Sequence, residues 1–397
     1  MPVNSTAAVT ARDGFVIAFD EQELLQRMQL FRDLSIPTSE IRRRFFTSGR
    51  SKKYVPGDTR GWKLEDARRI MAADTQWNRY ARACLYRPFD RRVIYWADWM
   101  IDWPRLNVMQ YMTRTKNLAL VTRRQMLPHQ PCNFFWVSDS IVIDGVIRSD
   151  NRGSESLFPL YLPDGTEDHA TRASTPISAN FAPPFVKTVE HATGLRWDPS
   201  RPTAGNRFFG PQDLLAYIYG LFHAPSYRQR YADWLCIDFP RVLLPHSKNL
   251  FRSLSRLGCR LIEQHIGFVA NEGKPLTVQG KRGTLHGCGG SHSNGDTGAA
   301  MVGRGYPKHE GERILIDDNF AMEGVSPETW QFQVGGHQVC EKWLRDRRGR
   351  RLGGAEWSRF RQIVSAIQET QRCIVELDRQ IDHHGGWPKA FSPRSDQ

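Results

Sequence analysis

Apolar positions spaced by three and four residues predict helices towards both ends of the chain. Near the N-terminus, Leu24, Met28 and Phe31 share one helical face, and Asp20 with Glu23 forms a capping-box pattern. Shorter helices are predicted at 39–46 and 62–71. The clearest helix is predicted at 355–382, where one seam runs along Phe360, Ile363, Ile367, Thr370, Ile374, Leu377 and Ile381. Because the seam has fewer than four heptads, we expect an arm packed on its own domain, not a free coiled coil.

The pattern changes from Leu85 onwards to short β-like runs separated by Pro, Asp and Gly. Strands are predicted at 93–96, 118–122, 134–137 and 141–143, with a short helix at 106–111 after Pro104. Residues 163–206 are rich in Pro, Ser, Thr and Gly, which predicts a long surface connection. Strands and helices without regular βαβ alternation indicate an α+β fold with a mixed sheet.

Helical patterns dominate again from Pro211. Helices are predicted over 214–222, from Pro225 onwards and over 250–262, and a Gly-rich loop over 280–305 precedes a strand at 314–316. We therefore divide the chain into four parts by sequence pattern. They are a helical lead-in over 1–84, an α+β lobe over 85–210, a helix-rich lobe over 211–384 and a disordered tail over 385–397.

Charge changes this picture, because Lys and Arg (55) outnumber Asp and Glu (42) and give a net charge of +13. Such a surplus favours a polyanionic partner such as nucleic acid. No apolar run approaches the ~20 residues of a membrane span. Seven cysteines without a C-x-x-C pair argue against a disulfide scaffold and a zinc ribbon, and they favour a reducing cytoplasm.

Motifs for catalysis are missing from the sequence. There is no phosphate-binding P-loop, no G-x-G-x-x-G, no G-x-S-x-G and no Asn-Pro-Pro-Tyr motif beside a turn for S-adenosylmethionine. His286, Cys288 and His292 lie close together in a Gly/Ser loop without a clear fourth zinc ligand. Asp317 and Asp318 are best interpreted as a solvated acidic turn. No enzyme site is predicted.

Basic residues interleaved with aromatic and amide side chains remain as candidates. They form clusters at 86–92, 122–125 and 342–351, the last preceded by Gly335-Gly336-His337-Gln338. Arg and Gln can bind base edges, while Lys and Arg also bind phosphates. Ordinary ion pairing or solvation is the competing interpretation of each cluster. The candidate DNA-binding residues are Arg123, Arg124, Gln125, His337, Gln338, Lys342, Arg345, Arg347, Arg348 and Arg350.

Several stretches of this sequence are similar to one protein family. They are LYRPFDRRVIYW (85–96), DWPRLNVMQYM (102–112), NLALVTRRQ (117–125), LFPLYL (157–162), AYIYGLFHAPSYRQRYADWLCIDFPRVLLP (216–245) and VSPETWQFQVGGHQVCEKWLRDRRGRRL (325–352). They resemble the C-terminal specificity domain of Type ISP restriction–modification enzymes and related adenine-N6 DNA methyltransferases. RDGFVIAFD (12–20) is similar to the stretch by which that family leaves its methyltransferase domain.

The resemblance implies a target-recognition domain that reads a short asymmetric duplex sequence and presents an adenine to a methyltransferase domain. Full-length members also carry a nuclease and a translocating motor. This chain starts where the methyltransferase domain should be ending, so we expect it to be catalytically inert alone and to bind no cofactor. S-adenosylmethionine would belong to a separate or lost methyltransferase domain.

The stretch 281–303 departs from the resemblance, because β-like sequence is expected there and little is found. Three other interpretations stay open. The chain could be a specificity subunit that acts in trans with a separate catalytic chain, a protein-interaction module that docks through the seam at 360–381, or the remnant of a broken gene.

Overall fold

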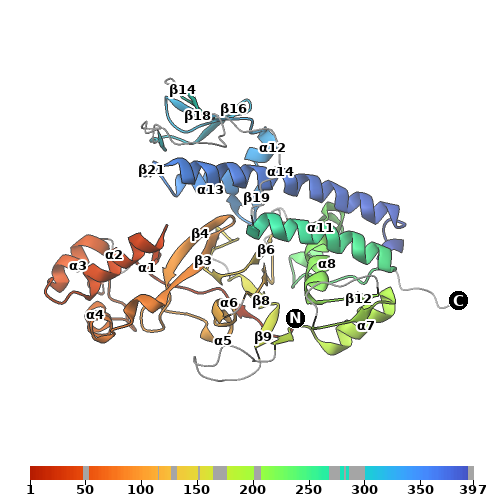
Figure 1. Cartoon of the computed structure of the whole chain (residues 1–397), viewed down its shortest axis with the longest axis horizontal. Helices are drawn as coiled ribbons and strands as arrows, with labels where there is room; N and C mark the ends of the chain where they lie inside the picture. Colours follow the sequence, from red (N-terminus) through yellow and green to blue (C-terminus); the bar gives the residue numbers. More distant parts are fainter. Residues whose placement is uncertain are drawn as a thin grey trace. The chain divides into compact units, whose positions relative to one another are not determined.

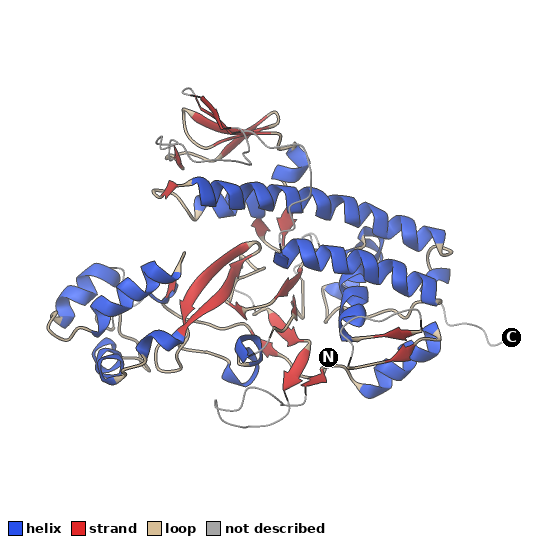
Figure 2. Cartoon of the chain, viewed as in Figure 1, coloured by secondary structure: helices blue, strands red, loops and turns tan. Residues whose placement is uncertain are grey.

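The computed structural model describes residues 1–47, 53–114, 116–126, 132–150, 153–163, 177–200, 207–267, 278–280, 283–285 and 300–391. Helices and several small sheets are mixed along these residues, which confirms the α+β class (Figure 2). In the part of the chain that the structure describes, no helix is both long and apolar enough to cross a lipid bilayer.

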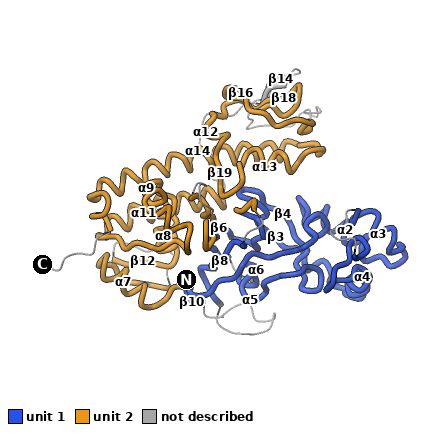
Figure 3. Tube along the Cα trace, turned by 180° about the vertical axis from the view of Figure 1, so that it is seen from behind, with its two compact units in different colours: residues 1–121, 138–146, 152–180 blue, residues 122–137, 147–151, 181–397 orange. Residues whose placement is uncertain are grey.

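The chain forms two compact units, and neither is continuous in sequence (Figure 3). Unit 1 comprises Met1–Val121, Ser138–Val146 and Arg152–Asn180. Unit 2 comprises Thr122–Val137, Ile147–Asn151 and Phe181–Gln397. The domain boundaries expected after residues 84 and 210 stay predictions.

Unit 1 combines a helical N-terminal part, which includes α2, α3 and α4 (Figure 1), with a four-stranded sheet in the order β2-β4-β3-β7. The hairpin of β3 and β4 is antiparallel, whereas β3 and β7 are parallel. The helices are α1 (Asp13–Val16), α2 (Glu21–Arg32), α3 (Thr38–Phe45), α4 (Leu64–Ala73), η1 (Trp77–Tyr80), α5 (Leu106–Met109) and α6 (Tyr111–Arg114). The strands are β1 (Ser5–Thr6), β2 (Ile17–Ala18), β3 (Ala81–Arg87), β4 (Asp90–Tyr95), β5 (Ala119–Thr122, the last residue of which belongs to unit 2), β7 (Ile141–Val142), β8 (Ser156–Pro159), β9 (Tyr161–Pro163) and β10 (Ile177–Ala179).

The predicted cap and apolar face of α2 are both present in unit 1. The Asp20 side chain accepts a hydrogen bond from the Glu23 backbone at 2.7 Å, and Phe31 is fully buried. Arg68 of α4 is also buried, and it donates to the carbonyl oxygen of Phe31 and the hydroxyl of Thr38, both at 2.8 Å. These bonds satisfy a buried charge and tie α4 to the α2–α3 region.

Unit 2 is built on three helices, α8, α11 and α14, that pack on one another. Its helices are α7 (Pro183–Thr193), α8 (Pro211–His223), α9 (Pro225–Arg230), α10 (Ala232–Leu235), α11 (Lys248–Gly267), α12 (Pro327–Trp330), α13 (Val339–Arg345), α14 (Gly354–His383) and η2 (Lys389–Phe391). Its strands are β6 (Phe135–Ser138, the last residue of which belongs to unit 1), β11 (Arg196–Trp197), β12 (Phe208–Phe209), β13 (Val278–Gly280), β14 (Gly283–Leu285), β15 (Ala300–Met301), β16 (Lys308–Glu310), β17 (Arg313–Leu315), β18 (Phe320–Glu323), β19 (Gln333–Val334), β20 (His337–Gln338) and β21 (Arg351–Leu352). Five of these strands form an antiparallel sheet in the order β14-β13-β18-β17-β16.

Most of the seam predicted for α14 is buried inside unit 2, with Ile374 half-buried. Phe360, Ile363, Ile367, Leu377 and Ile381 have no exposed surface, and α14 packs along α11. The expectation of an arm packed on its own domain is therefore confirmed.

Two expectations about connections need correction. Residues 163–206 were expected to be a long surface connection, but α7 lies within them. Pro183 and Pro184 occupy the first turn of α7, where a missing N–H is tolerated, and Val186 and Val189 are buried on one face. Proline thus starts this helix instead of preventing it.

The described part of the predicted disordered tail, 385–391, is also folded. Ala390 is fully buried and its carbonyl oxygen accepts a hydrogen bond from the His246 backbone at 2.9 Å. Trp387 Nε1 donates to the Ser226 hydroxyl at 2.9 Å. Most of the Gly-rich segment 280–305 lies outside the described residues.

Candidate nucleic-acid interface

The third basic cluster begins in α13, which follows directly on the β19–β20 hairpin. Gly335 and Gly336 connect these two strands, and the Gly336 N–H donates to the Ile147 carbonyl oxygen at 2.9 Å. Gly335 has φ +56°, and a Cβ atom there would lie 1.7 Å from that same oxygen. The hairpin needs glycine for this close approach, and the contact fixes the start of α13.

Two basic side chains of α13 are paired along the helix. Lys342 binds Asp346 and Arg345 binds Glu341, each with the spacing of four residues that stabilises helices. The Arg345 side chain is still 54% exposed, so its charge remains accessible to a ligand.

Arg347 is buried, unlike its neighbours. Its guanidinium lies 3.6 Å from the centre of the Trp343 ring and donates to the Trp343 carbonyl oxygen at 3.1 Å. Nε of Arg347 also lies 4.0 Å from a Glu356 oxygen at the start of α14. These contacts stabilise the turn between α13 and α14.

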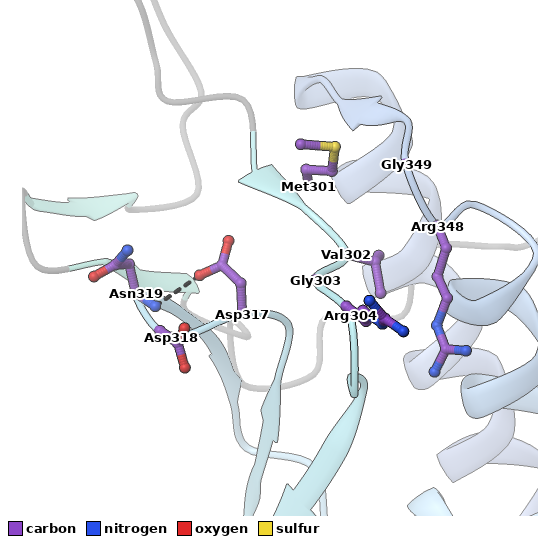
Figure 4. Close-up of a pocket in the computed structure, with 9 residues that line it drawn as sticks. All are labelled: Met301, Val302, Gly303, Arg304, Asp317, Asp318, Asn319, Arg348 and Gly349. Carbon is purple, nitrogen blue, oxygen red and sulfur yellow. Dashed lines mark hydrogen bonds between the residues drawn. The ribbon is translucent and has the colours of Figure 1, made fainter.

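Arg348 lines a hollow of about 620 Å³ in unit 2. Figure 4 shows Arg304 and Arg348 on one side of this hollow and Asp317, Asp318 and Asn319 on the other. Nε of Arg348 donates to the carbonyl oxygen of Tyr306 at 2.8 Å. The full lining is Met301, Val302, Gly303, Arg304, Asp317, Asp318, Asn319, Arg348 and Gly349.

The acidic side of the hollow is the turn between β17 and β18. Asp317 Oδ1 accepts hydrogen bonds from the backbone N–H groups of Asn319 at 2.7 Å and Phe320 at 2.9 Å. Asp318 Oδ1 accepts one from the Tyr306 hydroxyl at 2.7 Å. The turn is therefore held in place while the Asn319 side chain stays exposed.

This set of side chains matches the chemistry of base edges. Guanidinium groups can bind guanine, an asparagine amide can bind adenine, and carboxylates can accept from cytosine. The sequence had singled out Arg348, but it had not associated Arg304 with this site. The Asp317–Asp318 pair had been interpreted only as a solvated acidic turn. The sequence contains no motif that links Arg304 to the Asp317–Asp318 turn, because these segments come together only when the chain folds.

The second basic cluster, after β5, is attached to other parts of unit 2. Arg123 is buried, forms an ion pair with Asp150 at 2.8 Å and lies over the Phe134 ring. Arg124 pairs with Asp238 at 3.0 Å, but its side chain is 70% exposed. The Gln125 amide donates to the Ile237 carbonyl oxygen at 3.0 Å. Arg123 thus supports the fold, whereas Arg124 presents its charge to solvent.

The remaining predicted residues lie near the hairpin and the turn that follows α13. His337 is 7% exposed in β20, and Gln338 donates to the Trp330 carbonyl oxygen at 2.7 Å. Arg350 is half-buried. DNA contact by any of these candidate residues stays a prediction.

The first basic cluster belongs to the β3–β4 hairpin of unit 1. Arg92 forms two hydrogen bonds with the buried Asp90 carboxylate, at 2.7 and 3.0 Å. Its guanidinium also lies 3.9 Å from the centre of the Tyr86 ring. The charge of Arg92 is therefore neutralised by an ion pair within the hairpin.

A metal site has no support among the described residues, where no group of three His, Cys, Asp or Glu side chains could hold an ion. The possible zinc ligands His286, Cys288 and His292 lie outside the described part of the chain.

Comparison with known proteins gives matches that cover nearly the whole chain. The family model of the Type ISP C-terminal specificity domain matches residues 1–376. No curated protein sequence gives a significant match.

Solved structures share the fold at low sequence identity. The ATP-dependent Type ISP restriction–modification enzyme LlaBIII bound to DNA matches with a TM-score of 0.65, 14% identity and 94% of this chain covered. A nuclease-deletion mutant of the Type ISP enzyme LlaGI with a DNA substrate mimic gives 0.61, 17% and 94%, and a DrdV–DNA complex gives 0.61, 17% and 96%. The chain spans only 23%, 27% and 35% of these proteins, respectively. By its family match, this chain belongs to the Type ISP C-terminal specificity domains.

Proposed function

We propose that this chain recognises a specific duplex DNA sequence as the specificity domain of a restriction–modification system. The family match over residues 1–376 is the observation that carries this proposal. The solved relatives support it, because each was determined with DNA or a DNA mimic. The net charge of +13 supplies a sequence-independent attraction to phosphates.

Within this proposal, exposed and buried arginines have different roles. Arg348 and Arg304 read base edges from the hollow together with Asn319, because all three border the same space. Arg123 and Arg347 support the surrounding structure instead, because both are buried against aromatic rings.

Methylation and cleavage lie outside the proposed activity of this chain. In this proposal S-adenosylmethionine and the pocket for the flipped adenine belong to a methyltransferase domain, and this chain determines where that domain acts. A specificity subunit acting in trans would use the same DNA-reading surface. That version additionally requires a separate catalytic chain, so co-purification with a methyltransferase that carries an Asn-Pro-Pro-Tyr motif distinguishes the two.

The alternative of a protein-interaction module that docks through the α14 seam is disfavoured. Phe360, Ile363 and Ile367 are already buried inside unit 2, so the seam offers little surface to a partner.

Selection of the purified chain against a pool of random duplexes, at low and high salt, tests the proposal. We expect one asymmetric motif to be enriched at both salt concentrations. If the chain binds duplexes without enriching a motif, and this binding disappears at high salt, its affinity is only the non-specific attraction of a basic surface for phosphates. Absence of binding at both salt concentrations would refute DNA recognition by this chain.

A matched pair of variants tests the role of the hollow. Arg348→Ala removes a charge that lines the hollow, and Arg372→Ala removes an equally charged side chain of α14 that pairs with Glu369. We expect Arg348→Ala to relax the selected motif at one position, at a cost of about 1–3 kcal/mol. Arg372→Ala should leave the motif unchanged. Equal effects of both variants would argue against base reading by Arg348.

A further inference from the structure

We propose that Trp103 and Arg105 of unit 1 form a preformed contact for the sugar–phosphate backbone of duplex DNA. This inference rests on the proposed function and adds a binding contact in a part of the chain where none was predicted. Trp103 and Arg105 lie immediately before α5, on the segment that joins β4 to that helix.

The segment is held rigidly by bonds from several elements. The backbones of Val9 and Trp103 exchange two hydrogen bonds, at 3.1 and 2.9 Å. Arg12, itself buried, forms an ion pair with Asp102 at 2.7 Å and also donates to the Met100 carbonyl oxygen. Trp96 Nε1 donates to the Pro104 carbonyl oxygen at 3.1 Å. Trp103 and Arg105 are thus presented on an ordered backbone and not on a mobile loop.

Two large apolar side chains, one on this segment and one at the start of α5, are nevertheless exposed. Trp103 is 55% exposed and Leu106 is 43% exposed. The Arg105 guanidinium lies 4.7 Å from the centre of the Trp103 ring. Among the described residues, no side chain or carbonyl group forms an ion pair or a hydrogen bond with that guanidinium, and its Nε is shielded from solvent without a partner. The terminal N–H groups of this guanidinium, which are not shielded in this way, can donate to a phosphate oxygen.

The backbone of Arg105 is strained. It has φ +55° and ψ +42°, the left-handed conformation that glycine adopts more readily than arginine. Only Ala11 and Phe89 share a positive φ among the described residues other than glycine. Phe89 is buried in the β3–β4 turn, so its side chain has a packing role. The Arg105 side chain makes no comparable contribution to the core, which indicates a role towards a ligand.

The chemistry of the pair fits a DNA backbone. A guanidinium is planar and always charged, and it can bind two phosphate oxygens at once. Its position 4.7 Å from the Trp103 ring centre places charge and ring side by side, and the exposed indole can pack against the adjacent deoxyribose. Such contacts to phosphate and sugar determine how the protein is oriented on the duplex, but they do not distinguish one base sequence from another.

Substitution of Arg105 by glycine separates a binding role from a structural one. Arg105→Gly removes the guanidinium but suits the left-handed backbone, so we expect no decrease in thermal stability. With fluorescein-labelled duplexes of random sequence, we expect weaker binding across all sequences. The slope of log K against log salt should fall by about one. Arg105→Lys keeps the charge and should retain most of that slope.

The control is Arg69→Ala, which removes the same charge from α4. Arg69 pairs with Glu65 at 3.2 Å and with Asp66 at 3.5 Å, so its charge is locally compensated. We expect Arg69→Ala to leave the salt slope unchanged. An unchanged slope in Arg105→Gly, or an equal decrease in both variants, would overturn the inference.

A second substitution keeps the test independent of folding. Trp103→Ala removes a half-exposed ring, and we expect weaker binding with an unchanged melting temperature. Wild-type affinity in both Trp103→Ala and Arg105→Gly would refute the contact while leaving DNA recognition intact. If the wild-type chain itself binds no duplex, the proposed function has failed and this inference fails with it.

Discussion

The close approach of the β19–β20 hairpin to Ile147 allows a quantitative prediction. In Gly335→Ala the new Cβ would lie 1.7 Å from the Ile147 carbonyl oxygen and 3.1 Å from the Phe134 ring. A carbonyl oxygen of the backbone cannot rotate away as a flexible side chain can. The hairpin must therefore move, and with it the start of α13.

The expected cost has two parts. A residue with a Cβ in the left-handed conformation costs about 1–2 kcal/mol, and overpacking of a filled site costs about 1–3 kcal/mol more. Gly349→Ala is the matched control, because Gly349 has φ +77° but no atom within 4 Å of its Cβ position. Only the first cost applies there. The two variants should therefore differ by about 1–3 kcal/mol in free energy of unfolding.

Thermal unfolding followed by circular dichroism measures this difference. At about 2–4 °C per kcal/mol for a unit of this size, Gly335→Ala should melt several degrees below Gly349→Ala. DNA binding should weaken in Gly335→Ala as well, since the hairpin sets the position of α13. Equal melting temperatures for the two variants would refute the steric argument.

Three further predictions concern the interior of unit 2. Gly258→Ala places a Cβ 1.9 Å from the Ala216 carbonyl oxygen, where α8 and α11 pack together. We therefore expect the free energy of unfolding in urea to fall by about 1–3 kcal/mol, although alanine has the higher helix propensity. An unchanged urea midpoint would contradict this packing. Arg123→Ala should cost about 3–5 kcal/mol by removing the ion pair of this buried arginine with Asp150, and a much smaller loss in Asp150→Asn/Arg123→Ala than in the single variant would confirm the pairing. Burial lowers the pKa of His265 to about 3, below the ~6.5 of a histidine in the unfolded chain. The neutral ring therefore stabilises the folded state fully above about pH 6.5. This stabilisation is lost as the pH falls, by up to ~1.4 kcal/mol per pH unit. His265→Gln should reduce the pH dependence of urea unfolding between about pH 7 and pH 5, and an unchanged dependence would rule this out.

Elements defined by a strong local pattern could be predicted from the sequence. The seam of α14 and the Asp20 cap of α2 both depend on residues a few positions apart, and both are present. The helix α7 was missed because its two prolines and polar surroundings indicate a loop in composition. Proline favours a helix when it lies in the first turn and disrupts one when it lies further inside. Amino-acid composition alone does not show which of these positions a proline occupies.

The candidate site was predictable only in part. Residue type singled out Arg348, and the spacing of four between Glu341 and Arg345 could have indicated their pairing in advance. The burial of Arg347 depends on packing against the Trp343 ring. The presence of Arg304 in the same hollow depends on segments more than forty residues apart, for which a single sequence provides no signal.

The alternation of the chain between its two units limits how this protein can be divided or recombined. Residues 122–137 and 147–151 belong to unit 2 although unit 1 surrounds them in sequence. A crossover between two related genes at residue 180 would therefore combine Arg123 from one parent with the α8–α11–α14 helices from the other. Exchange of one whole unit consequently requires several crossovers, because the chain passes repeatedly between the two units.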